Sequence, residues 1–499
     1  MRDVVLAIDL GTSSLKAMLV DSDGAVVAEA AAAYPTASPT PQAAEQDPDL
    51  WWDALREVGS RLWADEGAVA KLRVTVIGLS GQMHGPVVLD AAGAVIRPCL
   101  LWSDSRSGPQ AQWLQETIGR DRLIAITGTA ANASGTVTKL LWMREHEPEF
   151  FARIRTVLLP KDHLRYRLTG RLASDPSDAS GTSMLDIRTR QWSSDLLAAC
   201  GLDAALLPDL LPSTAVAGHV TAEAAAALGL PVGVPVVTGG GDALCAALAM
   251  GIDGGDAGRA LVTLGTSGQL LVSTGAPAID PAGRLNTFCH VVPDQWCALA
   301  ATLSAGESLA WASRVASQHG LVSAQALLDL AATSPAGARG VLFAPYLSGE
   351  RTPHMDAAVA GAFAGLRGST DAADIVRAIL EGVAFALRDG LATLRANGLH
   401  VEDLRGTGGG ARSPLWCSIL ASVLGVPLAV PQPSHGSCYG AALLAFEPAG
   451  FPARAGGDAV STLAYRPDPA LADLYAARFR AYRTLYPGLK ALADTDLDL

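Results

Sequence analysis

The chain has 499 residues, of which 49% are hydrophobic and 17% are charged, so it can form about two or three globular domains and is not a disordered protein. The net charge is −12 and no run of Lys or Arg occurs, which argues against nucleic acid and anionic membranes as partners. Seven cysteines without a Cys-x-x-Cys pair indicate reduced thiols rather than a disulfide framework or a zinc site.

Two segments of the sequence indicate where in the cell the protein is located. Met1-Arg2-Asp3 leads directly into a strand pattern, so we expect no signal peptide. The Ala-rich stretch 222–250 is interrupted by Glu, Gly, Pro and Asp and does not predict a membrane span. Together with the reduced cysteines, these features predict a cytoplasmic protein.

Strands and helices alternate along both halves of the chain. Taken in order, the N-terminal half predicts strands at 4–10 and 15–20, a strand at 25–31, a helix at 49–62, strands at 74–79, 87–89, 100–102 and 157–159, a helix at 162–168, a strand at 235–238 and a helix at 243–250. The C-terminal half predicts a second pair of strands at 260–264 and 269–272 and helices at 305–316, 324–332, 372–397 and 414–424. This alternation predicts an α/β fold with mixed sheets, and the glycine-rich segment 251–258 marks the crossing between halves.

A short phrase, Leu-Gly-Thr-Ser, occurs at 10–13 and again at 264–267, each time between two apolar strands. Such a turn offers backbone N–H groups and small hydroxyls to a phosphate oxygen. Two ordinary hairpins could share four residues by chance, but the pairing and the adjoining Asp9 favour two related halves that hold one polyphosphate. The candidate phosphate-binding residues are Gly11, Thr12, Ser13, Gly265, Thr266 and Ser267.

A glycine-rich turn at 406–411 is a weak match to the dinucleotide fingerprint. The fingerprint needs an acidic residue about 20 positions on, yet after Asp403 the next acidic residue is Glu447, and the strand pattern before the glycines is poor. No Gly-Lys pair occurs, which excludes a Walker A loop. We interpret the turn as a place where a flat ring can approach the backbone; a plain glycine-rich turn is the alternative.

Asp242 follows a buried strand and three glycines and precedes a helix. Ligands collect at the carboxyl edge of the strands in α/β sheets. Phosphoryl transfer to an alcohol needs an acceptor for the hydroxyl proton, and a positioned aspartate can serve. Asp is also a good helix N-cap, and the two roles can coexist.

Polar side chains for a polyhydroxylated ligand stand in two further places. Gln82, Met83 and His84 lie between glycines after the strand at 74–79, where they can contact a polyol, although a lone histidine often has a structural role. Trp102 and Asp104, with Arg106, combine an apolar ring with polar groups as sugar sites often do, and an ordinary ion pair in a loop is the alternative.

Two long patterns resemble those of the FGGY carbohydrate kinases, in the superfamily of actin, hexokinase and the heat-shock chaperones. One is Thr136-x-x-Lys-Leu-x-Trp-Met-x-Glu-His146, and the other runs from Gly361-x-Phe-x-Gly-Leu to Asp374-Ile-x-x-Ala-Ile-Leu-Glu381. The resemblance covers nearly the whole chain. It implies two actin/hexokinase-like (ribonuclease H-like) domains around a central cleft.

The resemblance also implies roles for particular residues. It implies a sugar-binding domain at 1–250, an ATP-binding domain at 251–450 and a helical extension at 451–499, with Mg-ATP as co-substrate. Asp242 would be the catalytic base, and Asp9 would help hold the metal-bound phosphates. The adenine would be bordered by Gly409, Gly410 and Ala411, and the sugar would contact Gln82, Met83, His84, Trp102, Asp104 and Asp242.

Within the family the chain is most similar to members that phosphorylate D-xylulose at O5, and a homodimer would be common among them. Ala243 stands where that branch commonly has Asn, and Cys438-Tyr439 where the family usually has Ala-Leu. Another ketose, a polyol or a sugar acid is therefore the alternative substrate. A non-catalytic actin-like nucleotide switch is a remoter alternative, against which the polar residues of the expected sugar site argue.

Overall fold

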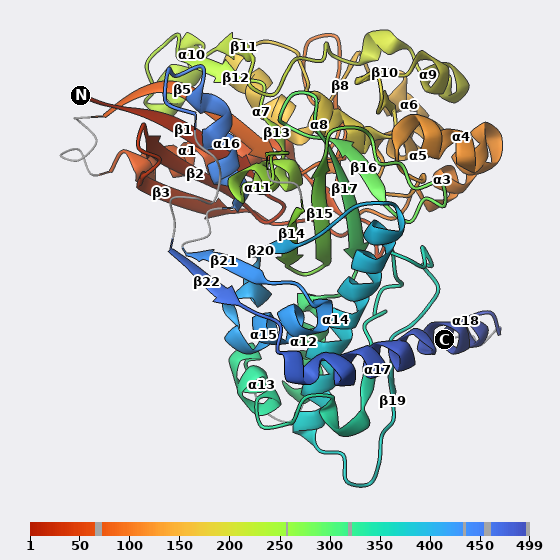
Figure 1. Ribbon diagram of the computed structural model, residues 1–499. Helices are drawn as coiled ribbons and strands as arrows, with labels where there is room; N and C mark the ends of the chain where they lie inside the picture. The colour runs from red at the N-terminus through yellow and green to blue at the C-terminus, as the bar shows by residue number, and fades with distance from the viewer. Residues whose placement is uncertain (65–71, 256–257, 318–321, 433–435, 454–460, 496–499) are drawn as a thin grey trace.

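The computed structural model describes residues 1–64, 72–255, 258–317, 322–432, 436–453 and 461–495, which form two stacked lobes (Figure 1). The upper lobe in Figure 1 contains most of the N-terminal half, and the lower lobe contains most of the C-terminal half. Residues 256–257 of the expected crossing, and 454–460 and 496–499 of the expected extension, lie outside the described residues.

The upper lobe is built on a mixed sheet with the strand order β11-β12-β5-β1-β2-β3. Strands β1, β2 and β3 are antiparallel, whereas β5 and β12 run parallel to β1, and the short β13 extends the pairing of β5. The strands are β1 Arg2–Leu10, β2 Ser14–Asp21, β3 Val26–Ala33, β5 Leu72–Gly81, β11 Val216–His219, β12 Pro235–Val237 and β13 Gly240–Gly241.

The lower lobe repeats this arrangement with the order β16-β17-β15-β14-β20-β21-β22. Here β17, β15 and β14 are antiparallel, and β20 and β21 continue parallel to β14. The strands are β14 Arg259–Leu264, β15 Gly268–Thr274, β16 Asn286–Cys289, β17 Trp296–Thr302, β20 Asp403–Thr407, β21 Leu428–Gln432 and β22 Ser461–Tyr465. The two copies of the Gly-Thr-Ser turn therefore occupy equivalent hairpins, β1–β2 and β14–β15, and the expected α/β architecture with mixed sheets is confirmed.

Alternation along the strands separates three apolar layers, because successive side chains point to opposite faces of a sheet. In β1, Val4, Leu6 and Ile8 pack in the outer layer of the upper lobe, while Val5 and Ala7 pack in the layer between the two sheets. The outer layer of the upper lobe is covered by helices α1 Pro48–Leu62, α7 Pro160–Thr169 and α10 Ala222–Leu228. The middle layer holds α11 Asp242–Ala249 and α16 Gly436–Phe446.

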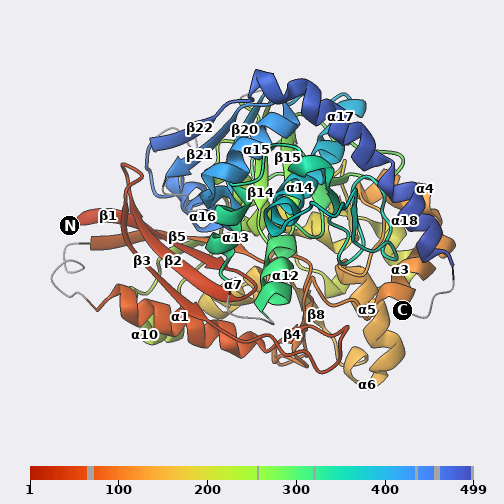
Figure 2. The same ribbon diagram turned by 90° about the horizontal axis from the view of Figure 1, so that it is seen from below.

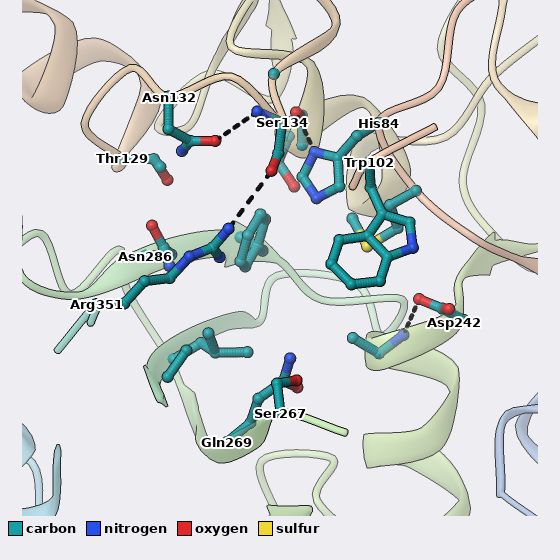
Figure 3. A pocket seen from close by; sticks show the side chains of 18 of the residues that line it. His84, Trp102, Thr129, Asn132, Ser134, Asp242, Ser267, Gln269, Asn286 and Arg351 are labelled. Atoms are coloured by element: carbon teal, nitrogen blue, oxygen red, sulfur yellow. Dashed lines mark hydrogen bonds between the residues drawn. The ribbon is translucent and has the colours of Figure 1, made fainter. Parts of the chain in front are cut away.

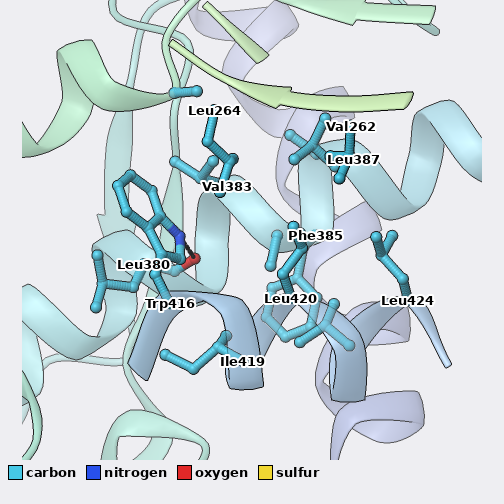
Figure 4. Packing of buried hydrophobic residues seen from close by; sticks show 14 of the residues in the cluster. Val262, Leu264, Leu380, Val383, Phe385, Leu387, Trp416, Ile419, Leu420 and Leu424 are labelled. Carbon is cyan, nitrogen blue, oxygen red and sulfur yellow. Dashed lines mark hydrogen bonds between the residues drawn. The ribbon is translucent and has the colours of Figure 1, made fainter. Parts of the chain in front are cut away.

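The third layer lies on the far face of the lower sheet, where Val262 and Leu264 of β14 pack against α14 and α15 (Figure 4). Trp416 fills this layer, and its Nε1 donates a hydrogen bond to the carbonyl oxygen of Leu380 at 3.2 Å. The helices of this layer are α12 Gly306–Ser317, α13 Ala324–Ala331, α14 Ala372–Ala396, α15 Pro414–Leu424 and α17 Ala472–Arg483.

A helical insertion extends the upper lobe on the side away from the N-terminus, as seen also from below (Figure 2). Its elements are β6 Val87–Leu89, α3 Gly108–Leu114, a π-helical turn Gln115–Gly119, α4 Arg120–Thr127, α5 Thr136–His146, α6 Pro148–Phe151, β8 Thr156–Leu158 and α9 Ser194–Cys200. Short elements elsewhere are β4 Glu45–Gln46, β7 Cys99–Leu100, α8 Pro176–Ala179, β9 Leu185–Asp186, β10 Gln191–Trp192, β18 Leu342–Ala344, β19 Ala362–Ala364, α18 Leu485–Ala493 and 3₁₀ turns at Ser180–Thr182, Ala204–Leu206, Ala338–Gly340, Gly409–Arg412 and Pro469–Leu471.

Most predicted elements are found within a few residues of their expected ends, but the segment before the glycine-rich turn differs. Residues 403–407 form β20, a strand paired on both sides in the lower sheet. The pattern was too short and too polar to indicate a strand. Gly406 packs closely in this strand: a Cβ there would lie 3.0 Å from the side chains of Leu428 and Val430. Within the described ranges, no helix is long and apolar enough to cross a membrane.

Helix α16 comes from near the end of the chain yet packs on the upper sheet and on α11 (Figure 1). Two glycines permit this close approach. A Cβ built on Gly440 would lie 1.9 Å from the carbonyl oxygen of Cys245, and one on Gly78 would lie 2.0 Å from that of Ala441. The helix, its neighbour α11 and strand β5 are therefore in backbone contact, with no space for a methyl group.

The Gly440→Ala substitution should destabilise the protein although alanine is normally the better helix residue by about 1 kcal/mol. Overpacking a closed contact costs about 1–3 kcal/mol or more, so we expect the midpoint of thermal unfolding to fall by roughly 5 °C. Gly488→Ala in α18 is the matched control, because nothing lies within 4 Å of the added Cβ. Equal midpoints for the two variants would contradict this account of the contact.

Candidate active site

A cavity of about 220 Å³ lies between the two halves of the chain and is lined by residues of both (Figure 3). Thr12, Met83, His84, Trp102 and Asp242 come from the N-terminal half. The C-terminal half contributes Ser267, Gln269, Asn286, Phe288, Leu299, Ala301, Thr302, Leu303 and Arg351. The structure thus brings the expected base, most of the expected sugar contacts and one residue of each hairpin to a single cavity.

Asp242 is the first residue of α11, and Gly241 rather than Asp242 occupies the N-cap position. One carboxylate oxygen, Oδ1, accepts a hydrogen bond from the N–H of Ala243 at 2.7 Å, and the side chain lines the cavity. Burial, together with the nearby charge of Asp9, raises the pKa of Asp242 to about 7. A carboxyl group with such a pKa can hold or release a proton near neutral pH.

The turn before Asp242 is held by a buried network of charges. The N–H of Gly241 donates to Ser177 Oγ at 3.1 Å, and Ser177 Oγ donates to Asp175. Lys161 Nζ lies 2.8 Å from Asp175 Oδ1 and 2.6 Å from Asp162 Oδ1, and all of these side chains are fully buried. This chain of contacts ties Gly241, the residue before the Asp242 carboxylate, to α7 and α8.

Asp9 lies at the end of β1 on the same face as Val5 and Ala7, so it points toward the N-terminus of α16. Ser437 Oγ donates a hydrogen bond to Asp9 Oδ2 at 2.7 Å. No donor among the described residues reaches the buried Oδ1. Burial raises the pKa of Asp9, and the Ser437 hydrogen bond and the charge of Lys16 offset this only in part. A buried carboxylate oxygen without a partner fits a Mg²⁺ ion, which is commonly held by one or two carboxylates, water and substrate phosphates.

The first hairpin turn is fixed by Tyr34. The Tyr34 hydroxyl donates to the carbonyl oxygen of Gly11, and its N–H donates to that of Ser13 at 3.2 Å. Trp102 Nε1 donates to Thr12 Oγ1 at 3.0 Å, which joins the hairpin to the cavity wall. The Ser13 side chain is exposed at the turn.

His84 has a left-handed backbone conformation (φ 74°) that directs its ring into the cavity wall. Its Nδ1 lies 2.6 Å from the carbonyl oxygen of Gly181, so Nδ1 carries a proton and donates it. Burial, together with the charge of Lys139, lowers the pKa of His84 to about 4. The ring is therefore neutral, and its other nitrogen, Nε2, is an acceptor that faces the cavity in Figure 3.

Two expected sugar contacts lie outside this cavity. The Asp104 carboxylate is buried and accepts hydrogen bonds from the N–H of Ala44 at 2.9 Å and from the Arg106 guanidinium at 2.6 Å. The Gln82 amide is also buried, and its Nε2 donates to Gln46 Oε1 at 3.1 Å. Both side chains support neighbouring loops rather than line the cavity.

A second cavity, of about 510 Å³, is lined entirely by the C-terminal half. The glycine-rich turn contributes Gly409 and Gly410, and the second hairpin contributes Gly265 and Thr266. Nothing lies within 4 Å of a Cβ placed on Gly409, so a planar ring could approach the backbone there. Ala411 is buried next to these residues and does not line the cavity.

The N-terminus of α12 supports the second hairpin on the other side of this cavity. The N–H of Gly306 donates to the carbonyl oxygen of Gly265 at 2.8 Å, and the N–H of Glu307 donates to that of Thr266 at 3.1 Å. These two bonds fix the β14–β15 hairpin against the first turn of α12, next to the second cavity. Its last residue, Ser267, lines the first cavity, so the β14–β15 turn joins the two cavities.

Sequence reasoning missed several residues that line the first cavity. Asn286 and Phe288 lie on β16, a strand that its four-residue length concealed. Asn132 and Ser134 lie just before the pattern that begins at Thr136, which indicated the family but not a contact. Arg351 lies in a loop far along the chain, and only the fold brings it here.

The model of the N-terminal domain of the FGGY family of carbohydrate kinases matches residues 4–249, and that of the C-terminal domain matches residues 260–447. The chain is 39% identical over 423 residues to the xylulose kinase of Escherichia coli (strain K12), which is 85% of each chain.

Solved structures agree with this. The structure of xylulose kinase from Rhodospirillum rubrum matches with a TM-score of 0.90 and 34% identity, over 98% of this chain and 100% of that one. Gluconate kinase from Lactobacillus acidophilus matches with a TM-score of 0.91 and 26% identity, over 99% of each chain. Because the two family models together span most of its length, the protein belongs to the FGGY family of carbohydrate kinases.

Proposed function

We propose that this carbohydrate kinase transfers the γ-phosphoryl group of ATP to O5 of D-xylulose. The observation that carries the proposal is the position of Asp242 in a cavity shared by both halves, beside the hairpin turn that joins it to the second cavity. The xylulose kinases among its relatives support the choice of sugar.

In this proposal the second cavity takes the nucleotide. Its volume of about 510 Å³ suits a base and ribose, with the adenine against Gly409 and Gly410. The phosphates would then extend along the second hairpin, past Gly265 and Thr266, toward Ser267. Backbone N–H groups and hydroxyls of such turns hold phosphate oxygens.

The chain's own residues supply positioning and one proton acceptor. Asp242 orients the attacking hydroxyl and accepts its proton at a carboxylate oxygen, while the new O–P bond forms and the bond from phosphorus to ADP breaks. His84 Nε2 accepts a hydrogen bond from another hydroxyl of the sugar. Asp9, with its unpaired Oδ1, would hold Mg²⁺, which when bound neutralises charge on the phosphates.

In this proposal each half of the chain binds one of the two substrates. We propose that residues 1–250 bind the sugar and that residues 251–450 bind ATP. The segment 451–499, expected to be a helical extension, contains α17 and α18 but also β22, which pairs with β21 in the lower sheet. In this view α16 is an exception, because it packs on the upper sheet. We also propose that the protein is cytoplasmic and that it forms a homodimer. A homodimer would have twice the mass of one chain in light scattering.

A substrate panel tests the sugar. We expect ATP-dependent release of ADP to be fastest with D-xylulose when the protein is assayed with pentuloses, polyols and hexonates at equal concentration. A higher kcat/KM with a polyol or a hexonate would assign another substrate. ADP release that does not depend on any sugar would instead favour a nucleotide switch.

Asp242→Asn keeps the size of the side chain and removes the base. We expect kcat to fall by roughly 100-fold or more, the scale of general-base catalysis, with little change in sugar binding measured by calorimetry. Asp195→Asn, an exposed site in α9, is the control. A near-normal kcat for Asp242→Asn would leave that residue without a role in proton transfer.

Asp9→Ala removes the carboxylate assigned to the cation. Activity should fall, and the Mg²⁺ concentration for half-maximal activity should rise by about tenfold, because one carboxylate fewer helps to fix the ion and its water shell. Asp3→Ala on the same strand, where Asp3 pairs with Arg73 at the surface, is the control. If Asp9→Ala and Asp3→Ala require the same Mg²⁺ concentration, Asp9 is structural.

A further inference from the structure

Arg351 enters the first cavity from the C-terminal half, on the loop between β18 and β19. In Figure 3 its guanidinium and the Asp242 carboxylate lie on opposite sides of the cavity. Among the described residues, the Arg351 side chain makes a single hydrogen bond, from Nη2 to Ser134 Oγ at 3.4 Å. This long contact leaves most of its five donors available.

The neighbouring carboxylate, Glu350, makes no hydrogen bond with the Arg351 side chain. Glu350 accepts hydrogen bonds from Thr302 Oγ1 at 2.6 Å, from the N–H of Leu303 at 3.2 Å and from the backbone N–H of Arg351 at 2.7 Å. Its oxygens are thus directed to the end of β17 rather than to the guanidinium. A cation is therefore presented to the cavity, and no carboxylate of the described residues lies at hydrogen-bond distance from it.

The loop that carries Arg351 is fixed to β17. The N–H of Thr352 donates to the carbonyl oxygen of Ala301 at 2.9 Å, and Thr352 Oγ1 accepts from the N–H of Ala301 at 3.1 Å. Thr352 Oγ1 also donates to the carbonyl oxygen of Arg284 at 2.7 Å. The guanidinium is therefore held from a rigid base, as selective recognition requires.

Three ionisable side chains of the cavity differ in what they can donate or accept. Asp242, when it is ionised and acts as the base, and the neutral His84 accept hydrogen bonds from a ligand, at the carboxylate and at Nε2. Arg351 can only donate. A ligand that satisfies all three offers hydroxyl groups to Asp242 and His84 and an acceptor oxygen to Arg351.

We propose that Arg351 is a specificity-determining residue that binds the carbonyl oxygen of the ketose. The inference rests on the proposed function, since it requires a sugar whose terminal hydroxyl lies at Asp242. A 2-ketopentose bound in this way has its carbonyl near the other end of the carbon chain. The carbonyl oxygen can accept a hydrogen bond but cannot donate one. It therefore pairs with the guanidinium of Arg351, which donates, and not with His84 Nε2, which accepts.

The test compares three sugars with the wild type and with Arg351→Met. D-Xylulose has both the carbonyl and the C1 hydroxyl, 1-deoxy-D-xylulose keeps only the carbonyl, and xylitol replaces the carbonyl by a hydroxyl. We expect Arg351→Met to lower kcat/KM by about 10- to 100-fold for both ketoses, since the carbonyl loses a charged donor and stays unpaired. The loss for xylitol should be several-fold smaller, because a hydroxyl can turn and donate elsewhere.

Controls separate this role from a structural one. Arg351→Lys keeps a cationic donor and should recover part of the ketose activity, and Arg122→Met, at an exposed ion pair in α4, should match the wild type. The KM for ATP should stay within about twofold in all variants. Equal losses for ketoses and xylitol, or a parallel rise in the KM for ATP, would overturn the inference. A wild type inactive on both ketoses would overturn the proposed function instead.

Discussion

The packing of α16 against α11 and β5 is the contact on which the geometry of the site depends. Both helices lie in the middle layer between the two sheets, and both begin at the cavity region: α11 with Asp242, and α16 with Ser437 one residue after its start. Gly440 and Gly78 bring the backbones so close that neither helix can slide without a clash. The backbone contact thereby fixes how Asp242 lies relative to Asp9, whose charge helps to raise the pKa of Asp242.

The middle layer contacts the lower sheet through side chains rather than through the backbone. Leu261, Leu271 and Leu299 of the lower sheet pack on the helix pair through apolar side chains. Such contacts are non-directional, so they resist separation but allow small rotations more readily than the glycine contacts do. The upper sheet with α11 and α16 therefore forms one firm unit, and the lower sheet is the part that can shift relative to it.

Sequence patterns predicted most of the fold because its signals are local. The helix at 414–424 is bounded by Ser413, whose hydroxyl caps it, and by Gly425 in a left-handed conformation, and both were visible as residue types. The paired Gly-Thr-Ser turns likewise showed two equivalent hairpins. The site was less accessible, because a residue after a strand can turn either way: His84 lines the cavity, while Gln82, two residues earlier, is bonded to Gln46. Arg351 could not be found from the sequence, because its place depends on how distant segments pack.

The two cavities differ in which half builds them, and this difference bears on how a kinase avoids transfer to water. The larger cavity belongs wholly to the C-terminal half, so a nucleotide could occupy it whatever the position of the other lobe. The smaller cavity needs Asp242 and His84 from one half and Ser267 and Arg351 from the other. In the proposed function, a sugar that engages both His84 and Arg351 stabilises the approach of the halves, and that approach brings Asp242 to the hairpin assigned to the phosphates. A water molecule has no second hydroxyl or carbonyl group with which to join the two residues, so the proposed productive geometry depends on the sugar.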